Sequence, residues 1–297
     1  GVQTCALPIL AMTIYVVGEI MTDIVALTDT QDFAFASDTL AKITFHGGGA
    51  GANVASWLGT LGMSPVFIGA CGNDEQGKVL TEELESFGVI THMRKSSKST
   101  GTLISIVNAS GERTMFPDKG ANSDLQASWL PQVQKDDLVY VSGYSLLSTE
   151  TCDEALKILQ VSHSQGARVA IDLASHALIQ QSGSSKVLSW LNYCDLLFLN
   201  VDEGEALFGT REINEILSRL PCLTILKAGS AGSFATGGVH QPAVSAHVVD
   251  TTGAGDAYAA GFLSRWAVDQ GLQSAMEKGS QCAAEVISIS GARPHHP

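Results

Sequence analysis

A chain of 297 residues is long enough to bury a substantial hydrophobic core, as one large α/β domain or as two smaller ones. Its composition, 45% hydrophobic and only 16% charged with 30 glycines, excludes a disordered chain. The formal net charge of −13 argues against nucleic-acid binding through bulk electrostatics, because a phosphate backbone requires a basic face.

Cysteine usage and apolar runs bear on the compartment. The six cysteines are scattered and form no CxxC pair, so neither a zinc site nor a disulfide framework is indicated. Buried free thiols fit a reducing cytoplasm. No apolar run approaches the roughly 20 residues of a membrane helix, and the hydrophobic start lacks the basic region of a secretory signal. We expect a cytoplasmic protein that contacts no membrane.

The first nine residues, GVQTCALPI, match the in-frame translation of a common sequencing-library adapter. We therefore expect residues 1–9 to be a non-native segment. Met12 would then be the natural start, opening directly into the first strand.

Residues 14–18 form a continuous apolar run, typical of a parallel strand covered on both faces. Asp23 follows, and local sequence alone favours a solvated loop aspartate there.

Two other stretches predict a small sheet beside the core. Residues 28–46 suit exposed strands better than core, and residues 100–116 alternate and turn at 108–111 like a hairpin. We expect about 22–46 and 98–116 to form a discontinuous lid.

A first glycine turn, HGGGAGAN at residues 46–53, leaves several interpretations open. Gly47, Gly49 and Ala52 satisfy GxGxxG/A after an apparent strand, which is the weak signature of a nicotinamide-dependent oxidoreductase. After the turn, apolar residues recur at the spacing of a helix. Asn53 can be read as a helix N-cap.

Strands and helices alternate through the rest of the chain. Residues 66–72 read as a strand, and 73–88 as a helix opened by Asn73 or Asp74. The alternation from residue 138 onward predicts a doubly wound, mainly parallel α/β sheet in a single domain, 12–297. Ligands gather at the carboxyl ends of such strands. Asn200 and Glu203 follow one of them and can also be read as a helix cap.

The stretch HVVDTTGAGDAYAAGFL, residues 247–263, reads as a strand end at Val248 and Val249, a glycine turn, and a helix. Such a turn aims backbone N–H groups and the positive end of the helix dipole at one point, which suits a phosphoryl group. Asp256 beside that point is either a base that takes a proton from a hydroxyl or a plain helix cap.

Residues 250–262, DTTGAGDAYAAGF, resemble the C-terminal signature of the ribokinase-like (PfkB) family of carbohydrate kinases. GGxGxN at 48–53, NxxE at 200–203 and KAGSAG at 227–232 resemble its other motifs, and the resemblance runs from Ile14 to Pro294. It implies ATP-dependent phosphorylation of a primary hydroxyl on a sugar or sugar-like substrate, with Mg²⁺, in a homodimer formed through the lid.

The resemblance also implies roles for single residues. Asp256 is the expected catalytic base, beside an anion hole formed by the amides of Gly253, Ala254 and Gly255. The expected sugar ligands are Asp23, Gly48, Gly49 and Asn53. Mg²⁺ is expected near Asn200 and Glu203, partly through water, and a monovalent cation, K⁺, at Asp250 and Thr252. Expected nucleotide contacts are Lys227, Gly229, Gly232 and Ser280, with a surface lysine as the alternative for Lys227.

The chain departs from close ribokinase relatives at Ser280, where they tend to have Asn, and at His295, where they tend to have Ser. These departures put adenine contacts and the full cation shell in doubt. Two alternatives remain within the superfamily. A nucleoside kinase would need a flat apolar pocket near the lid. A phosphosugar kinase would need a cation for a second phosphate, and the candidates are Arg94, Lys95, Lys98, Arg113 and Lys119.

Overall fold

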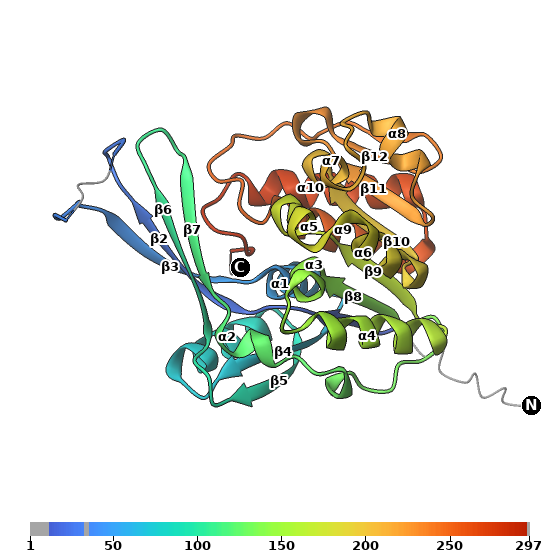
Figure 1. Cartoon of the computed structure of the whole chain (residues 1–297), viewed down its shortest axis with the longest axis horizontal. Coiled ribbons are helices and arrows are strands. Elements are labelled where there is room, and N and C mark those ends of the chain that lie inside the picture. The colour runs from blue at the N-terminus through green and yellow to red at the C-terminus, as the bar shows by residue number, and fades with distance from the viewer. Residues whose placement is uncertain (1–11, 33–35, 296–297) are drawn as a thin grey trace, which may run out of the picture.

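The computed structural model describes residues 12–32 and 36–295, so the adapter-like segment at 1–9 lies outside the described residues. Figure 1 shows a large sheet with helices on both faces and a smaller sheet standing to one side. The doubly wound sheet with a small second sheet is therefore confirmed. Among the helices of the described residues, none has both the length and the apolar character needed to cross a bilayer.

The large sheet has nine strands in the order β13-β12-β11-β10-β9-β8-β1-β4-β5. Its strands are parallel from β11 to β5, while β12 and β13 add an antiparallel edge. The bounds are β1 (Ile14–Val17), β4 (Val66–Gly72), β5 (Ile90–Ser96), β8 (Leu138–Ser142), β9 (Arg168–Asp172), β10 (Leu196–Asn200), β11 (Leu223–Lys227), β12 (Ser233–Ala235) and β13 (Val239–Gln241).

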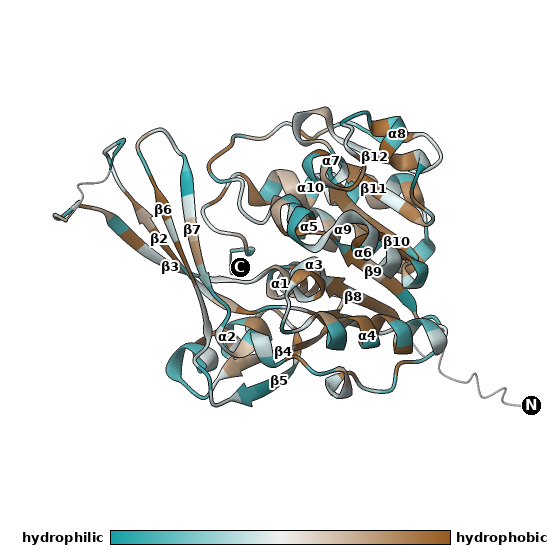
Figure 2. Ribbon diagram, viewed as in Figure 1, coloured by the Kyte–Doolittle hydropathy of each residue, from teal (hydrophilic) through white to brown (hydrophobic). Residues whose placement is uncertain are grey.

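Apolar side chains on both faces explain why the central strands of this sheet are buried. In β1, Ile14 and Val16 join one hydrophobic core, and Tyr15 and Val17 join the other. Figure 2 shows the hydrophobic colour along β8, β9 and β10, whereas the edge strand β5 is hydrophilic. The first core is covered by α1 (Ala50–Thr60), α2 (Glu75–Ser86), α9 (Ala254–Asp269) and α10 (Leu272–Val286). The second is covered by α3 (Gly143–Leu147), α4 (Cys152–Ser164), α5 (His176–Ser182), α6 (Ser184–Trp190), α7 (Val201–Phe208) and α8 (Ile213–Ser218).

The second sheet has the strand order β3-β2-β6-β7. Its strands are β2 (Met21–Leu27), β3 (Lys42–Gly48), β6 (Gly101–Val107) and β7 (Arg113–Asp118). β6 and β7 form the antiparallel hairpin that alternation predicted. The strand ahead of the first glycine turn is β3, which pairs antiparallel with β2 outside the parallel sheet. The dinucleotide interpretation of that turn, with its oxidoreductase, is therefore wrong, because it requires a parallel βα unit.

Two further local predictions, a helix and a strand end, can be compared with the structure. The helix predicted at 73–88 is α2, and the carboxylate of its N-cap, Asp74, accepts a hydrogen bond from the backbone of Gly77 at 2.8 Å. The strand end predicted at Val248 and Val249 is wrong. Both side chains are exposed, and the N–H of Val249 donates to the carbonyl of Ile287 at the end of α10 rather than to a neighbouring strand.

Candidate functional site

The second glycine turn places a carboxylate in the first turn of α9. Gly253 is the N-cap of this helix, with φ of 75°, and a β-carbon placed on it would lie 2.5 Å from Cβ of Ala292. Only glycine meets both the backbone conformation and the close approach. The backbone of Ala254 donates to the carbonyl of Thr251 at 3.3 Å. The first-turn amides and the helix dipole thus converge beside Asp256.

Asn53 holds the Asp256 carboxylate directly. Its Nδ2 donates to Oδ2 of Asp256 at 2.8 Å, across the packed pair α1 and α9. The N-cap interpretation of Asn53 is wrong, since Gly49 caps α1 and Asn53 lies inside it. Burial raises the pKa of Asp256 to about 7, against the lowering effect of the Asn53 hydrogen bond. Asp172 raises this pKa further and Lys227 lowers it.

Arg293 is a site residue that sequence reasoning missed. Its guanidinium is buried and donates to the carbonyl of Gly48 at 2.8 Å, to Glu83 at 2.5 Å and to Oδ1 of Asn53 at 3.4 Å. The preceding residue is also fixed, because the indole of Trp57 donates to the carbonyl of Ala292 at 3.0 Å. An isolated arginine near the end of the chain carries no motif that marks it in advance.

Asp23 lies in β2 and meets the end of β3. Its carboxyl fills the space that a side chain at Gly48 would occupy, so only glycine is accommodated there. Burial raises the pKa of Asp23 to about 6, and the charge of Arg293 acts against that rise. Among the described residues, Oδ1 of Asp23 is buried without a hydrogen-bond partner. The loop interpretation of Asp23 is therefore wrong.

Lys227 and Asp172 form a buried ion pair at the carboxyl ends of β11 and β9. Nζ of Lys227 lies 2.6 Å from Oδ2 of Asp172 and would lie 3.1 Å from a β-carbon placed on Gly255. A surface lysine is thus excluded, because the ammonium group points at the first turn of α9. Asp172 was missed, although it ends a buried apolar strand in the sequence. Its Oδ1 has no hydrogen-bond partner among the described residues.

Asn200 and Glu203 form a capping box at the start of α7, as the capping interpretation predicted. Oδ1 of Asn200 accepts from the backbone of Glu203 at 2.9 Å, and the Glu203 carboxylate accepts from the backbone of Asn200 at 2.9 Å and from its Nδ2 at 2.8 Å. Burial and the charge of Asp172 raise the pKa of Glu203 to about 7, while Lys227 lowers it.

The remaining expected nucleotide residues differ in accessibility. Gly229 is exposed in the short 3-10 turn η4 (Gly229–Ala231), whereas Gly232 is buried against Gln241, and its N–H donates to the carbonyl of Gly229 at 3.0 Å. Ser280 is buried in α10. Of these three, Gly229 presents its backbone most openly.

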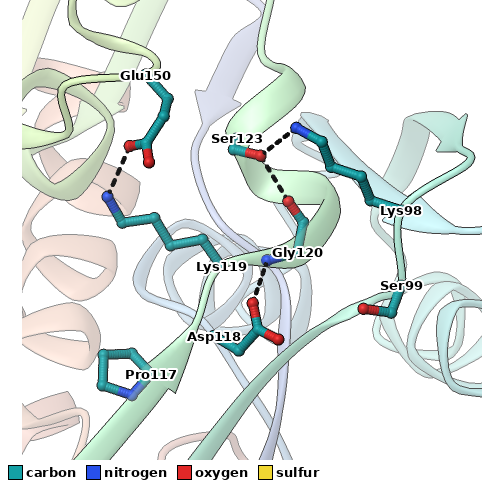
Figure 3. Close-up of a pocket in the computed structure, with 8 residues that line it drawn as sticks. All are labelled: Lys98, Ser99, Pro117, Asp118, Lys119, Gly120, Ser123 and Glu150. Atoms are coloured by element: carbon teal, nitrogen blue, oxygen red, sulfur yellow. Dashed lines mark hydrogen bonds and ion pairs between the residues drawn. The ribbon is translucent and has the colours of Figure 1, made fainter.

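Two of the basic candidates, Lys98 and Lys119, line a cavity of about 680 Å³, shown in Figure 3. Lys119 points toward Glu150, 3.1 Å away, and Lys98 toward Ser123, with Asp124 at 2.6 Å from its Nζ. This cavity lies where β7 meets the 3-10 turn η1 (Gly120–Asp124), apart from the residues around Asp256. Because acids neutralise both lysines, the cavity gives little support to a second phosphate site.

A parallel sheet whose carboxyl edge carries a buried lysine, acids and a helix N-terminus is the arrangement of an α/β enzyme. The family model of the pfkB family carbohydrate kinases matches residues 12–297 of the chain. The chain belongs to this family and is an ATP-dependent carbohydrate kinase.

Related proteins and solved structures agree with this family assignment. The chain is 26% identical over 294 residues to ribokinase of Bacillus subtilis, covering 96% of both chains. It is 30% identical over 277 residues to aminoimidazole riboside kinase of Salmonella typhimurium, covering 82% of this chain and 83% of that one. The crystal structure of adenosine kinase from Sinorhizobium meliloti superposes with a TM-score of 0.84 at 25% identity, covering 96% of each chain.

Proposed function

We propose that the protein transfers the terminal phosphoryl group of ATP to a primary hydroxyl of a sugar or sugar-like substrate. The observation that carries this proposal is the Asp256 carboxylate in the first turn of α9, beside Nζ of Lys227. The carboxylate takes the hydroxyl proton, the freed oxygen bonds to phosphorus, and the bond from phosphorus to ADP breaks. A pKa of about 7 for Asp256 suits a base that works near neutrality.

Positive groups around the first turn of α9 would stabilise the migrating charge. The amides of Gly253, Ala254 and Gly255 supply fixed dipoles, and Lys227 supplies a full charge on the same side. Asp172 keeps the Lys227 ammonium group pointing there. We propose that the backbone of Gly229 contacts the nucleotide. Ser280 and Gly232, which are buried, would support the nucleotide site from inside the protein.

Mg²⁺ fits the acidic pair next to this lysine. Asp172 has a buried oxygen that finds no partner within the described part of the chain, and its charge acts on the Glu203 carboxylate. A divalent cation would satisfy that oxygen and relieve the repulsion between the two acids. Asn200 would orient Glu203 through the capping box. When bound, Mg²⁺ neutralises the oxygens of ATP.

We propose that the acceptor lies between the two sheets, on Asp23, Gly48, Gly49 and Asn53. Oδ1 of Asp23, which no donor of residues 12–32 and 36–295 reaches, suits a substrate hydroxyl donor. Arg293 would fix the sugar side of the site, since it holds both Asn53 and the Gly48 carbonyl.

A nucleoside is the second candidate acceptor. Tyr144 lies in α3, directly after the carboxyl end of β8, and is 40% exposed. An exposed ring offers a flat surface on which a nucleobase can stack. The similarity to an adenosine kinase at 25% identity supports the same candidate.

A panel of sugars and nucleosides decides between these acceptors. The measurements are ADP release with each compound and mass spectrometry of the product, which gains one phosphoryl group. A protein that hydrolyses ATP to the same extent with every compound, and phosphorylates none, would refute the proposal.

We also propose that the second sheet is the lid of this domain and the contact of a homodimer. Phe45, Ile24, Ile104 and Phe116 are cross-strand neighbours on one face, and Figure 2 shows hydrophobic stretches on this sheet. Arg113, on the opposite face of β7, reaches the main domain, so the apolar row faces away from it. Phe45 is 65% exposed, and a second copy would cover it.

Light scattering after gel filtration tests the dimer, with Phe45→Asp as the disrupting variant. A monomeric wild type at micromolar concentration would contradict it. We propose the cytoplasm as the compartment, because the described cysteines are free thiols and the substrate is ATP.

A further inference from the structure

An arginine of the second sheet is bound to the loop that leads into α9. Arg113 opens β7 at the end of the hairpin remote from η1, paired with Val107. One nitrogen of its guanidinium donates to Oδ1 of Asp250 at 2.5 Å, and the other donates to Oγ1 of Thr252. Asp250 and Thr252 are the two residues at which the sequence predicts a monovalent cation.

The carboxylate of Asp250 is also fully occupied by its own surroundings. Its Oδ1 accepts from the backbone N–H of Thr252 at 2.9 Å and from Oγ1 of Thr252 at 2.7 Å. Its Oδ2 accepts from the backbone of Gly291 at 3.3 Å. The guanidinium of Arg113 therefore already supplies a positive charge to this carboxylate.

These contacts do not fit a monovalent cation at the same place. A cation on Oδ1 of Asp250 and Oγ1 of Thr252 would meet the guanidinium that already contacts both atoms. Two positive charges at such a separation repel by at least about 1 kcal/mol even in water, and by more where water is partly excluded. The side chain of Asp250 is only 15% exposed, so screening there is incomplete.

We propose that Arg113 replaces the monovalent cation: its guanidinium supplies the positive charge that keeps Asp250 and Thr252, and with them the turn at Gly253, in place. The loop before α9 is then ordered by a side chain of the second sheet rather than by an ion from solution. Because Arg113 is part of that sheet, movement of the sheet away from the main domain removes the charge from the loop. The proposal rests on the proposed kinase activity only for its kinetic readout.

The test compares the wild type with Arg113→Ala in KCl and in choline chloride at equal ionic strength. Thermal unfolding is measured without substrates, and turnover with ATP and an acceptor from the panel. The wild type is expected to give the same Tm and the same kcat in both salts. Arg113→Ala is expected to lose about fivefold or more in kcat in choline, and to regain both Tm and kcat as KCl is added.

Arg265→Ala is the matched control, because it also removes an arginine paired with an aspartate, Asp269, on the exposed side of α9. It should follow the wild type in both salts. A wild type that K⁺ stabilises or activates relative to choline overturns the proposal. So does an Arg113→Ala protein whose Tm shows no specific response to K⁺. Failure of the proposed function looks different, since no acceptor is then phosphorylated in either salt while the Tm comparison still reports on the site.

Discussion

Nδ2 of Asn53 donates a hydrogen bond to Oδ2 of Asp256 over 2.8 Å, joining two residues 203 positions apart in the chain. The amide stabilises the charged form of the acid, against burial and the charge of Asp172, which favour the protonated form. The proton affinity of the proposed base therefore depends in part on a residue that the family resemblance assigns only to the sugar.

Asn53→Ala is expected to move the acidic limb of the pH profile of kcat/KM upward. A hydrogen bond to a charged group contributes about 1.5–3 kcal/mol, which corresponds to a shift of roughly one to two pH units. Thr60→Ala, which removes a hydroxyl bonded to Ser56 at 3.0 Å in the same helix, is the control and should leave the limb near pH 7. An unchanged limb in Asn53→Ala would show that the amide does not tune the base.

Asp256→Asn is expected to lower kcat by about 10²–10⁴-fold, which is the usual contribution of a general base, while ATP still binds. Turnover is followed by ADP release, and nucleotide binding by calorimetry. Full activity in this variant would remove Asp256 from the reaction.

The same substitution should stabilise the fold at alkaline pH. The pKa of Asp256 is raised from 3.8 to about 7 in the folded protein, so the folded state holds the proton more tightly than the unfolded state. The stabilisation from this proton is complete below about pH 4 and is lost as the pH rises through 7. Urea unfolding should therefore show Asp256→Asn to be more stable than the wild type by on the order of 1–3 kcal/mol at pH 8, with the difference vanishing near pH 4. A difference independent of pH would contradict this reasoning.

Substitutions of Lys227 and Asp172 should separate what this ion pair contributes to stability from what it contributes to catalysis. Lys227→Met leaves a buried acid unpaired, which costs about 3–5 kcal/mol, whereas Lys227→Met combined with Asp172→Leu removes both charges and should recover most of that loss. Activity should stay at least about 10²-fold down in both proteins, because the charge beside Gly255 is gone. Recovery of activity in the double variant would show that the lysine is only structural.

Arg293→Met is expected to raise KM for the acceptor more than it lowers kcat. The variant loses the donors to Gly48 and Asn53, and it also removes the charge that lowers the pKa of Asp23. Because that pKa is about 6 in the wild type and should rise, acceptor binding should weaken further between pH 6 and 8. Arg219→Ala, which breaks a 3.0 Å pair with Glu215 on α8, is the control for losing one charge.

Several features encoded by a continuous stretch of sequence were predicted correctly. The strand at 66–72 and helix α2 follow from apolar runs and an N-cap, and Asp256 with Gly253 lies within one unbroken motif. Contacts between distant segments could not be read the same way. Asp172 meets Lys227 across 55 positions and Arg293 meets Asn53 across 240, and neither pair has a spacing that marks it.

The error at Val248 and Val249 has a related cause. Two apolar β-branched residues before a glycine turn are typical of a strand, but a strand also needs a neighbour with free backbone groups. Here the available partner is the carbonyl of Ile287, at the end of a helix. Local sequence propensity predicted the turn correctly, but it could not identify the hydrogen-bond partner of Val249.

The indole of Trp57 holds the carbonyl of Ala292, and Arg293 holds the carbonyl of Gly48, so these two positions bind partners that are made 235 and 245 positions later. During synthesis on the ribosome, the parallel strands can pair before these partners emerge. A nascent polypeptide halted before residue 291 would therefore carry a folded sheet in which the Trp57 indole and the Gly48 carbonyl still lack these contacts.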